Sequence, residues 1–311
     1  MGVLHKKLEQ WLTKLNAESA EAAAQGYVPT VIGVREGFAG VGRSLMTKIP
    51  DVALIREGSI PTPGYNVPVR VYHPAPEKEL PVLIYYHGGG HCAGSVTMYD
   101  PVCRKLALAA NHIVVAPEYR LAPENPYPAG ENDCVAVAKH VWTVLDCLGL
   151  RYTRRLSVSG DSAGGALAAI AASRSQWDPN ISIHKQLLIY PNTDYTLGSS
   201  SFVELAVGYW LDKALMEWFS GTYLANNEDR KAVSPLYWEV SEKMPPAMFI
   251  TAQFDPLREE GLAYADKLKK AGVPAEVVLF DDMIHPFICL EDLVPEACAK
   301  AYAAMGAFLQ K

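Results

Sequence analysis

The chain has 311 residues, of which 50% are hydrophobic, and a formal net charge of −6 at pH 7. This length and composition predict a globular protein with one large domain and an appended cap, rather than two independent domains. The mild negative charge and the lack of a long basic run disfavour nucleic acid as a partner. No stretch approaches the ~18 consecutive apolar residues of a membrane span. The first helix-like segment is charged and lacks the apolar region of a signal peptide.

The N-terminal part of the chain predicts a helix followed by an antiparallel sheet edge. Residues 3–24 carry apolar residues at helical spacing, and a looser segment follows through Gly37–Gly42. Residues 53–73 are expected to form two strands around a turn at 61–64.

From residue 81 onward, strands and helices are expected to alternate. The strands are predicted at 81–86, 112–117, 155–159, 186–190, 246–252 and 275–280. The helices are predicted at 97–110, 131–148, 162–174, 257–271 and 294–309. Because the strands are near-continuous apolar runs, they predict an α/β fold with a mostly parallel sheet covered by helices on both faces.

One interval breaks this alternation. Residues 191–240 contain no good strand pattern but an aromatic-rich helix near 211–224. Together with the N-terminal segment, this interval supplies enough helix for a cap over one edge of the sheet. We therefore predict four segments along the chain: N-terminal cap helices at 1–50, core at 51–190, a cap insertion at 191–240 and the rest of the core at 241–311.

The sequence Gly160-Asp161-Ser162-Ala163-Gly164 stands between a predicted strand and a predicted helix of small residues. A sharp turn between strand and helix needs residues without bulk, and it exposes the central serine at the helix N-terminus. Backbone N–H groups and the helix dipole favour negative charge at that position. Ser162 is therefore the candidate nucleophile.

A second glycine-rich loop follows the strand at 81–86. His87-Gly88-Gly89-Gly90 places three glycines in a row, although glycine loses more backbone entropy on ordering than other residues. Bare N–H groups in such a loop are suited to hold an oxyanion, because side chains would block the approach. We expect Gly88 and Gly89 to donate to the oxyanion, together with the N–H of Ala163.

A histidine and a carboxylate follow the last two predicted strands. His285 comes just after the strand at 275–280, and Asp255 comes just after the strand at 246–252. The carboxyl ends of parallel strands are where an open α/β sheet places its site. Asp281 and Asp282 compete as the carboxylate, but they share the loop of the histidine and would have to fold back. The order Ser162, Asp255, His285 is that of an α/β-hydrolase triad.

The chain resembles the hormone-sensitive-lipase-like branch of the α/β-hydrolases, the microbial carboxylesterases of that group. The matching motifs are His87-Gly88-Gly89-Gly90, Tyr119-Arg120-Leu121-Ala122-Pro123-Glu124, Gly160-Asp161-Ser162-Ala163-Gly164-Gly165, Asp255-Pro256-Leu257 and His285-Pro286-Phe287. The resemblance implies an α/β-hydrolase fold with a helical cap, no cofactor, and hydrolysis of small esters with short to medium acyl chains. The sequence departs from the group at His91, where an aromatic or aliphatic residue is more common.

The walls of the binding pocket are harder to assign from the sequence. Substrate contacts are expected from aromatic, apolar and loop residues near the site, namely Phe38, His91, Tyr209, Leu211 and Ile284. Arg120 and Glu124 are expected to pair and to hold their loop beside the glycine triplet.

Two other functions remain open for the same fold. An enzyme that cleaves amides or carbamates could use the same triad. A non-catalytic receptor for a small molecule is disfavoured, because the receptors of this fold have lost the histidine that His285 supplies here.

The cysteines predict the redox compartment. Six are present, at positions 92, 103, 134, 147, 289 and 298, and none forms a C-x-x-C pair or has metal-ligand spacing with histidine. In a chain of this length they are expected to be reduced thiols, which favours a cytoplasmic protein without a bound metal. The sequence leaves the oligomeric state open, a homodimer included.

Overall fold

The computed structural model describes residues 2–26, 28–62 and 64–311. Its centre is an eight-stranded sheet in the order β1-β2-β4-β3-β5-β6-β7-β8. The strands are β1 (Leu54–Thr62), β2 (Tyr65–His73), β3 (Leu80–Tyr86), β4 (Ile113–Pro117), β5 (Tyr152–Asp161), β6 (Lys185–Ile189), β7 (Ala247–Phe254) and β8 (Ala275–Ile284). The strand at 112–117 and the others expected from residue 81 onward are all present, within a few residues of their predicted ends.

The sheet is antiparallel at one edge and parallel elsewhere. β1 pairs with β2, and β2 pairs with β4, both in antiparallel register. The predicted hairpin at 53–73 is therefore present, with Pro63 of its turn outside the described residues. Every pair from β4 to β8 is parallel. The carboxyl ends of these parallel strands consequently lie along one rim of the sheet.

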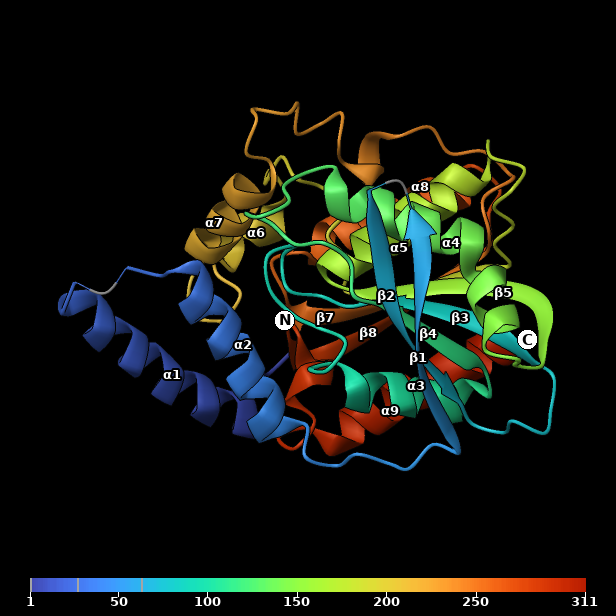
Figure 1. Cartoon of the computed structure of the whole chain (residues 1–311). Coiled ribbons are helices and arrows are strands. Elements are labelled where there is room, and N and C mark those ends of the chain that lie inside the picture. The colour runs from blue at the N-terminus through green and yellow to red at the C-terminus, as the bar shows by residue number, and fades with distance from the viewer. Residues whose placement is uncertain (1, 27, 63) are drawn as a thin grey trace.

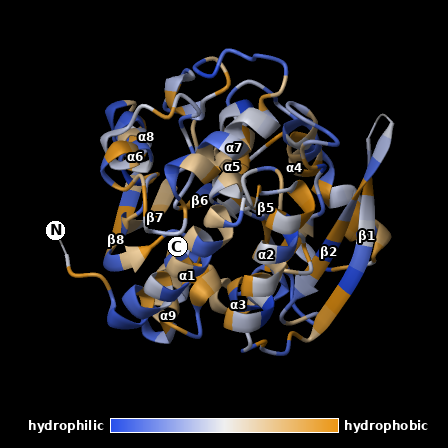
Figure 2. Cartoon of the chain, turned by 90° about the vertical axis from the view of Figure 1, so that its left-hand side faces the viewer, coloured by the Kyte–Doolittle hydropathy of each residue, from blue (hydrophilic) through white to orange (hydrophobic). Residues whose placement is uncertain are grey.

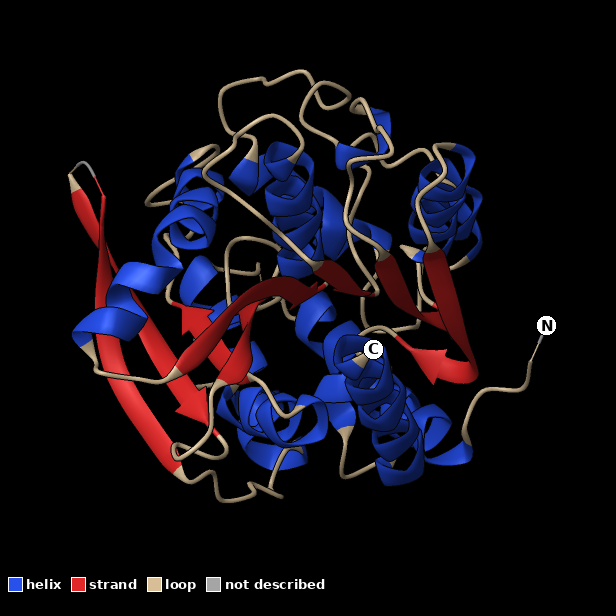
Figure 3. Ribbon diagram, turned by 90° about the vertical axis from the view of Figure 1, so that its right-hand side faces the viewer, coloured by secondary structure: helices blue, strands red, loops and turns tan. Residues whose placement is uncertain are grey.

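Two layers of helix enclose the sheet (Figure 3). The helices are α1 (Lys6–Ala24), α2 (Val31–Leu45), α3 (Asp100–Ala110), α4 (Ala129–Cys147), α5 (Ala163–Ser175), α6 (Ser200–Glu204), α7 (Lys213–Tyr223), α8 (Arg258–Lys270) and α9 (Pro295–Gln310). Short 3₁₀ turns occupy Pro235–Tyr237 and Phe287–Leu290. Among these described helices, no segment is both long and apolar enough to cross a bilayer.

Alternating side chains of the strands build a separate core on each face of the sheet. In β3, Leu83 and Tyr85 join the core that includes α3 and α9. Val82, Ile84 and Tyr86 join the core that includes α4, α5 and α8. Successive side chains of a strand point to opposite faces, so a strand covered on both sides is apolar at most positions. This explains the unbroken apolar runs in the sequence.

The helices α1, α2, α6 and α7 gather on one side of the molecule (Figure 1), and Figure 2 looks directly onto that side. The expectation of a looser segment at Gly37–Gly42 is wrong, because these residues lie within α2. The hydroxyl of Thr30 accepts from the N–H of Gly33 and caps the helix. A Cβ on Gly42 would lie 2.9 Å from Cγ of Met98, so this glycine lets α2 pack closely. Tertiary packing here outweighs the low helix propensity of glycine.

Candidate functional site

Ser162 lies in a strained turn between β5 and α5. Its backbone has φ 55° and ψ −121°, in the left-handed half of the map where a residue other than glycine is uncommon. The turn closes tightly, because a Cβ on Gly164 would lie 2.0 Å from the carbonyl oxygen of Tyr86. Only glycine fits at that position, which explains the glycine two residues after the serine. Backbone strain of this kind is frequent at functional sites.

Hydrogen bonds join Ser162, His285 and Asp255 in a continuous chain. Nε2 of His285 lies 2.9 Å from Oγ of Ser162, and Nδ1 of His285 lies 2.9 Å from Oδ2 of Asp255. The second carboxylate oxygen of Asp255 accepts from the N–H of Leu257 at 2.8 Å, and Asp255 is fully buried. The carboxylate is therefore fixed in place and holds the imidazole toward the serine.

The pairing of β7 and β8 explains how the aspartate and the histidine meet. Phe254 pairs with Ile284 across the two parallel strands, after a register shift that follows Ala252. Asp255 directly follows the end of β7, and His285 directly follows the end of β8. The two residues therefore lie side by side at the rim of the sheet. The ring of Tyr190 packs edge-on against His285, with 4.7 Å between ring centroids.

The glycine loop is anchored by the residue beside Ser162. Oδ1 of Asp161 accepts from the N–H of Gly88 and from the hydroxyl of Tyr85, both at 2.7 Å. Oδ2 accepts from the hydroxyl of Tyr99 at 3.0 Å. Burial raises the pKa of Asp161, and these hydrogen bonds oppose that effect.

The hydrogen bond from Gly88 to Asp161 contradicts the role that the sequence predicts for Gly88. Gly88 was expected to donate to an oxyanion, but its N–H is already used by Asp161. Gly89 and Gly90 line the cavity beside Ser162, whereas Gly88 is not among the residues that line it. Within the described part of the chain, the N–H groups of Gly89 and Gly90 have no hydrogen-bond partner. Ala163 begins α5, where a helix leaves its first N–H groups unpaired.

A cavity with about 660 Å³ of empty space, part of it open to solvent, lies above Ser162. Phe38, His91 and Leu211 line it, as expected from the sequence. Tyr209 and Ile284 do not line it. Tyr209 stacks on Phe254, with 5.6 Å between ring centroids, and Ile284 is fully buried in the β7–β8 pair.

His91 is a neutral, buried member of this lining. Its backbone φ is 61°, a left-handed conformation in which histidine is found more often than most residues. Nε2 lies 2.7 Å from the hydroxyl of Tyr195, and the ring stacks on Tyr223 with 3.8 Å between centroids. Burial, with a smaller effect from His87, lowers the pKa of His91 to about 3.

The loops around the site are tied together by two arginines. The predicted pair between Arg120 and Glu124 is wrong. Arg120 instead binds both carboxylate oxygens of Asp133 on α4, at 2.7 and 2.9 Å. Glu124 pairs with Arg35 on α2, and Arg35 also donates to the carbonyl oxygens of Cys92 and Ala122. The sequence could not show this, because Arg35 is 89 residues away from Glu124.

Several lining residues were missed by the sequence analysis. Asn192 had a usable signal, since a polar residue just beyond the carboxyl end of a buried strand is a site candidate. Gly90 also had a usable signal, because it is the third glycine of the triplet that was expected to hold the oxyanion. Four lining residues from the 191–240 interval gave no signal that separated a cavity wall from ordinary core, namely Tyr195, Trp210, Phe219 and Tyr223.

Comparisons with known proteins agree with this geometry. Residues 83–289 match the model of a family described as having the alpha/beta hydrolase fold. Carboxylesterase NlhH of Mycobacterium tuberculosis is 37% identical over 258 residues, covering 78% of this chain and 80% of that protein. Ethyl acetate hydrolase of Pseudomonas putida is 34% identical over 240 residues and covers 75% of each protein.

Solved structures extend the similarity to the whole fold. The esterase of Pyrobaculum calidifontis superposes with a TM-score of 0.86 at 35% identity, covering 99% of this chain and 98% of that one. An alpha/beta hydrolase from the metagenome of Lake Arreo superposes with a TM-score of 0.88 at 34% identity, covering 100% and 98%. The predicted fold class, family resemblance and ester-hydrolase activity are confirmed. The chain belongs to the α/β-hydrolase fold family, in its carboxylesterase branch.

Proposed function

We propose that this protein is a serine carboxylesterase that hydrolyses esters of short to medium acyl chains through an acyl-enzyme on Ser162. The observation that carries the proposal is the hydrogen-bonded chain from Asp255 through His285 to Ser162 at the edge of the cavity. A base within hydrogen-bond reach of a serine, itself oriented by a carboxylate, is the arrangement that activates a hydroxyl nucleophile.

In the first half of the reaction, His285 takes the proton of Ser162 while Oγ attacks the ester carbonyl. Asp255 stabilises the imidazolium that forms and fixes the tautomer that leaves Nε2 free. The imidazolium then protonates the departing alcohol. Water repeats the sequence on the acyl-enzyme and releases the acid, so the chemistry needs no cofactor.

The tetrahedral oxyanion is held by the N–H groups of Gly89, Gly90 and Ala163. Gly89 and Gly90 line the cavity with N–H groups that no described residue accepts from, and Ala163 stands at the N-terminus of α5. Gly88 supports this set indirectly, because its bond to Asp161 fixes the start of the loop. Loss of one such donor typically costs about 2.7–4 kcal/mol of transition-state stabilisation.

The four-segment organisation expected from the sequence belongs to the same proposal. Residues 1–50 and 191–240 act as the cap, since Phe38 of α2 and Met216 of α7 line the cavity from that side. All six cysteines are free thiols, which supports a cytoplasmic localisation, because the cytoplasm keeps thiols reduced.

The amidase and receptor alternatives are not favoured. Relatives that cover most of this chain are named as ester hydrolases, among them NlhH and ethyl acetate hydrolase. A receptor would also not need the Asp255–His285–Ser162 hydrogen bonds.

The test is turnover of a series of p-nitrophenyl esters beside a p-nitroanilide, with Ser162→Ala as the inactive variant. Ser159→Ala is the matched control, because Ser159 lies buried on β5, three residues before Ser162, and does not line the cavity. We expect ester turnover in the wild type and in Ser159→Ala, and at least a 10³-fold loss of kcat in Ser162→Ala, since removal of such a nucleophile can cost about 10⁶-fold. Equal activity of Ser162→Ala, or faster cleavage of the anilide than of the esters, would overturn the proposal.

A further inference from the structure

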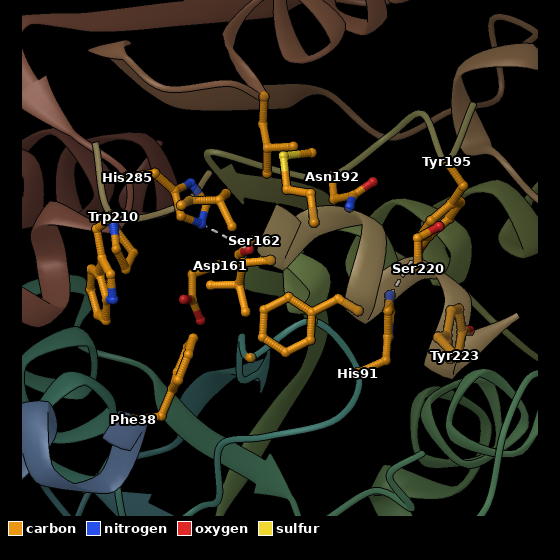
Figure 4. Close-up of a pocket in the computed structure, with 18 of the residues that line it drawn as sticks. Phe38, His91, Asp161, Ser162, Asn192, Tyr195, Trp210, Ser220, Tyr223 and His285 are labelled. Carbon is orange, nitrogen blue, oxygen red and sulfur yellow. Dashed lines mark hydrogen bonds between the residues drawn. The ribbon is translucent and has the colours of Figure 1, made fainter. Parts of the chain in front are cut away.

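The cavity has two chemically different ends on either side of Ser162 (Figure 4). Trp210 and Phe38 lie on the same side as His285. Polar side chains gather on the opposite side, namely His91, Asn192, Tyr195, Ser220 and Tyr223. We call these five residues the polar end. An ester of purely aliphatic parts would leave the unpaired polar atoms of this group unused, such as Nδ1 of His91 and Oδ1 of Asn192.

The polar end is built around the His91–Tyr195 hydrogen bond. The two side chains are 4% and 2% exposed, and their polar atoms lie 2.7 Å apart. Tyr223 covers one face of the imidazole, so the ring cannot turn freely. The pair is therefore a fixed wall of the cavity.

Hydrogen-bonding capacity remains unused at this end. Nδ1 of His91 and Oδ1 of Asn192 are buried and have no partner among the described residues. Oγ of Ser220 accepts from Arg230 at 2.9 Å, which leaves its hydrogen free to donate. A site with spare donors and spare acceptors fits an oxygen that can accept, such as a carbonyl, or both accept and donate, such as a hydroxyl.

The same residues argue against a charged ligand group. His91 is neutral, and burial keeps the hydroxyls of Tyr195 and Tyr223 protonated by raising their pKa values well above the ordinary range. Arg230, which contacts this wall from behind without lining the cavity, donates to Ser220 and to the carbonyl oxygen of Tyr195. No side chain of the polar end carries a charge.

The reaction geometry decides which part of the substrate reaches the polar end. The leaving oxygen must lie beside Nε2 of His285 to take its proton. The alcohol part therefore extends on the side of His285. Asn192 and Tyr195 lie on the other side of Ser162 (Figure 4), so we expect the acyl chain to extend toward them.

We propose that the polar end is a subsite for a neutral carbonyl or hydroxyl oxygen carried on the acyl chain of the ester. This proposal rests on the esterase function proposed above and narrows its substrate class to oxo-, hydroxy- or amide-bearing acyl esters. The His91–Tyr195 pair, Ser220 and Asn192 together determine this preference.

The test compares p-nitrophenyl 4-oxopentanoate, 5-oxohexanoate and 6-oxoheptanoate with the pentanoate, hexanoate and heptanoate. Each pair differs by one carbonyl oxygen, and the readout is the ratio of kcat/KM within a pair. At the chain length that reaches the polar end, we expect the oxo ester to be favoured by about 3- to 10-fold, the effect of one neutral hydrogen bond. We expect p-nitrophenyl hydrogen adipate, which carries a carboxylate, to be a poorer substrate than the hexanoate.

Tyr195→Phe removes one hydroxyl and keeps the ring, so the ratio should fall to between about 1 and 2. Tyr127→Phe is the matched control, because Tyr127 packs edge-on against Tyr223 but does not line the cavity. Its ratio should equal that of the wild type.

The outcomes separate the two proposals. Hydrolysis of the alkanoates with ratios at or below 1 at every chain length overturns the subsite and leaves the esterase intact. A ratio that Tyr195→Phe does not lower overturns it as well. Failure to hydrolyse any of the esters overturns the proposed function itself.

Discussion

The N–H of Gly88 donates to Oδ1 of Asp161 at 2.7 Å, so the residue next to the candidate nucleophile holds the loop that faces it. Tyr85 and Tyr99 donate to the same carboxylate. The serine turn and the glycine loop are thus one hydrogen-bonded unit, although 73 residues separate Gly88 from Asp161.

Asp161→Ala should lower both stability and activity. It leaves the N–H of Gly88 and the hydroxyls of Tyr85 and Tyr99 without a partner, and each unsatisfied buried group costs about 1–3 kcal/mol. Asp161→Asn keeps one acceptor oxygen, so its losses of stability and of activity should be smaller than those of Asp161→Ala. Urea unfolding and kcat/KM on one ester check the order wild type, Asp161→Asn, Asp161→Ala. An alanine variant as stable and active as the wild type would refute the anchoring role.

Gly90→Ala should reduce kcat by about 10²-fold or more, the usual effect of losing an oxyanion donor. The backbone φ at Gly90 is 61°, and a Cβ there would lie 2.3 Å from the ring of Phe219. Because alanine is also strained at this positive φ, we expect the loop to shift and its N–H to move away from the oxyanion. Gly64→Ala is the control, because Gly64 also has positive φ, at 79°, but faces open space in a distant turn. Equal kcat values for the two variants would contradict the role of Gly90.

Glu260→Gln should make stability less sensitive to rising pH. Burial, with the charges of Asp194 and Asp255 adding to it, raises the pKa of Glu260 well above its ordinary value. A group whose pKa is raised in the folded state favours folding most at pH values below its unfolded pKa of about 4.3. That contribution is lost as the pH rises through the folded-state pKa. Glutamine still accepts from the N–H groups of Thr193 and Asp194, which Oε1 now binds.

The measurement for Glu260 is the thermal midpoint between pH 5 and pH 9. The midpoint of the wild type should fall more steeply toward pH 9 than that of Glu260→Gln. Glu259→Gln serves as the control, since this neighbour on α8 has a side chain that is 40% exposed. Parallel curves for the wild type and Glu260→Gln would be inconsistent with the raised pKa.

Arg35→Met should loosen α2 from the glycine loop, whereas Glu124→Gln should have little effect. Arg35 donates to the carbonyl oxygens of Cys92 and Ala122, and hydrogen bonds from charged groups contribute about 1.5–3 kcal/mol. Its ion pair with Glu124 is bidentate, but the two side chains are 31% and 57% exposed, so solvent screens this pair and it contributes less than the carbonyl contacts. Limited proteolysis of α2 and KM for an ester report the difference. Equal protection of the two variants would show that the carbonyl contacts do not matter.

The sequence predicted the parts of the molecule that follow from chain-local pattern. Apolar runs located the strands, and residues just beyond strand ends supplied Ser162, Asp255 and His285. It could not predict contacts made by folding distant segments together. One such contact is the hydrogen bond from the N–H of Gly88 to Asp161. Another is the ion pair of Arg120, which forms with Asp133 and not with Glu124. The helix α2 was not predicted for a related reason. Its glycines indicate a loop when the sequence is considered alone, and the close packing of Gly42 against Met98 becomes visible only in the folded structure.

The cavity walls were the least predictable part. Leu211 and Tyr209 are two residues apart in an irregular segment, yet one lines the cavity and the other stacks on Phe254. Such a segment has neither the helical nor the strand repeat of side-chain directions. The direction of each side chain therefore depends on the path of the loop in space.

The Phe254–Ile284 pairing has a consequence for how this protein tolerates change. The ladder between β7 and β8 sets where Asp255 and His285 emerge, and the part of the connection beyond α8 does not contact the site. Extra residues inserted at the exposed turn around Gly272, after α8, would lengthen the connection without moving either side chain. That turn is therefore the place where an inserted peptide should disturb the hydrogen bonds among Ser162, His285 and Asp255 least.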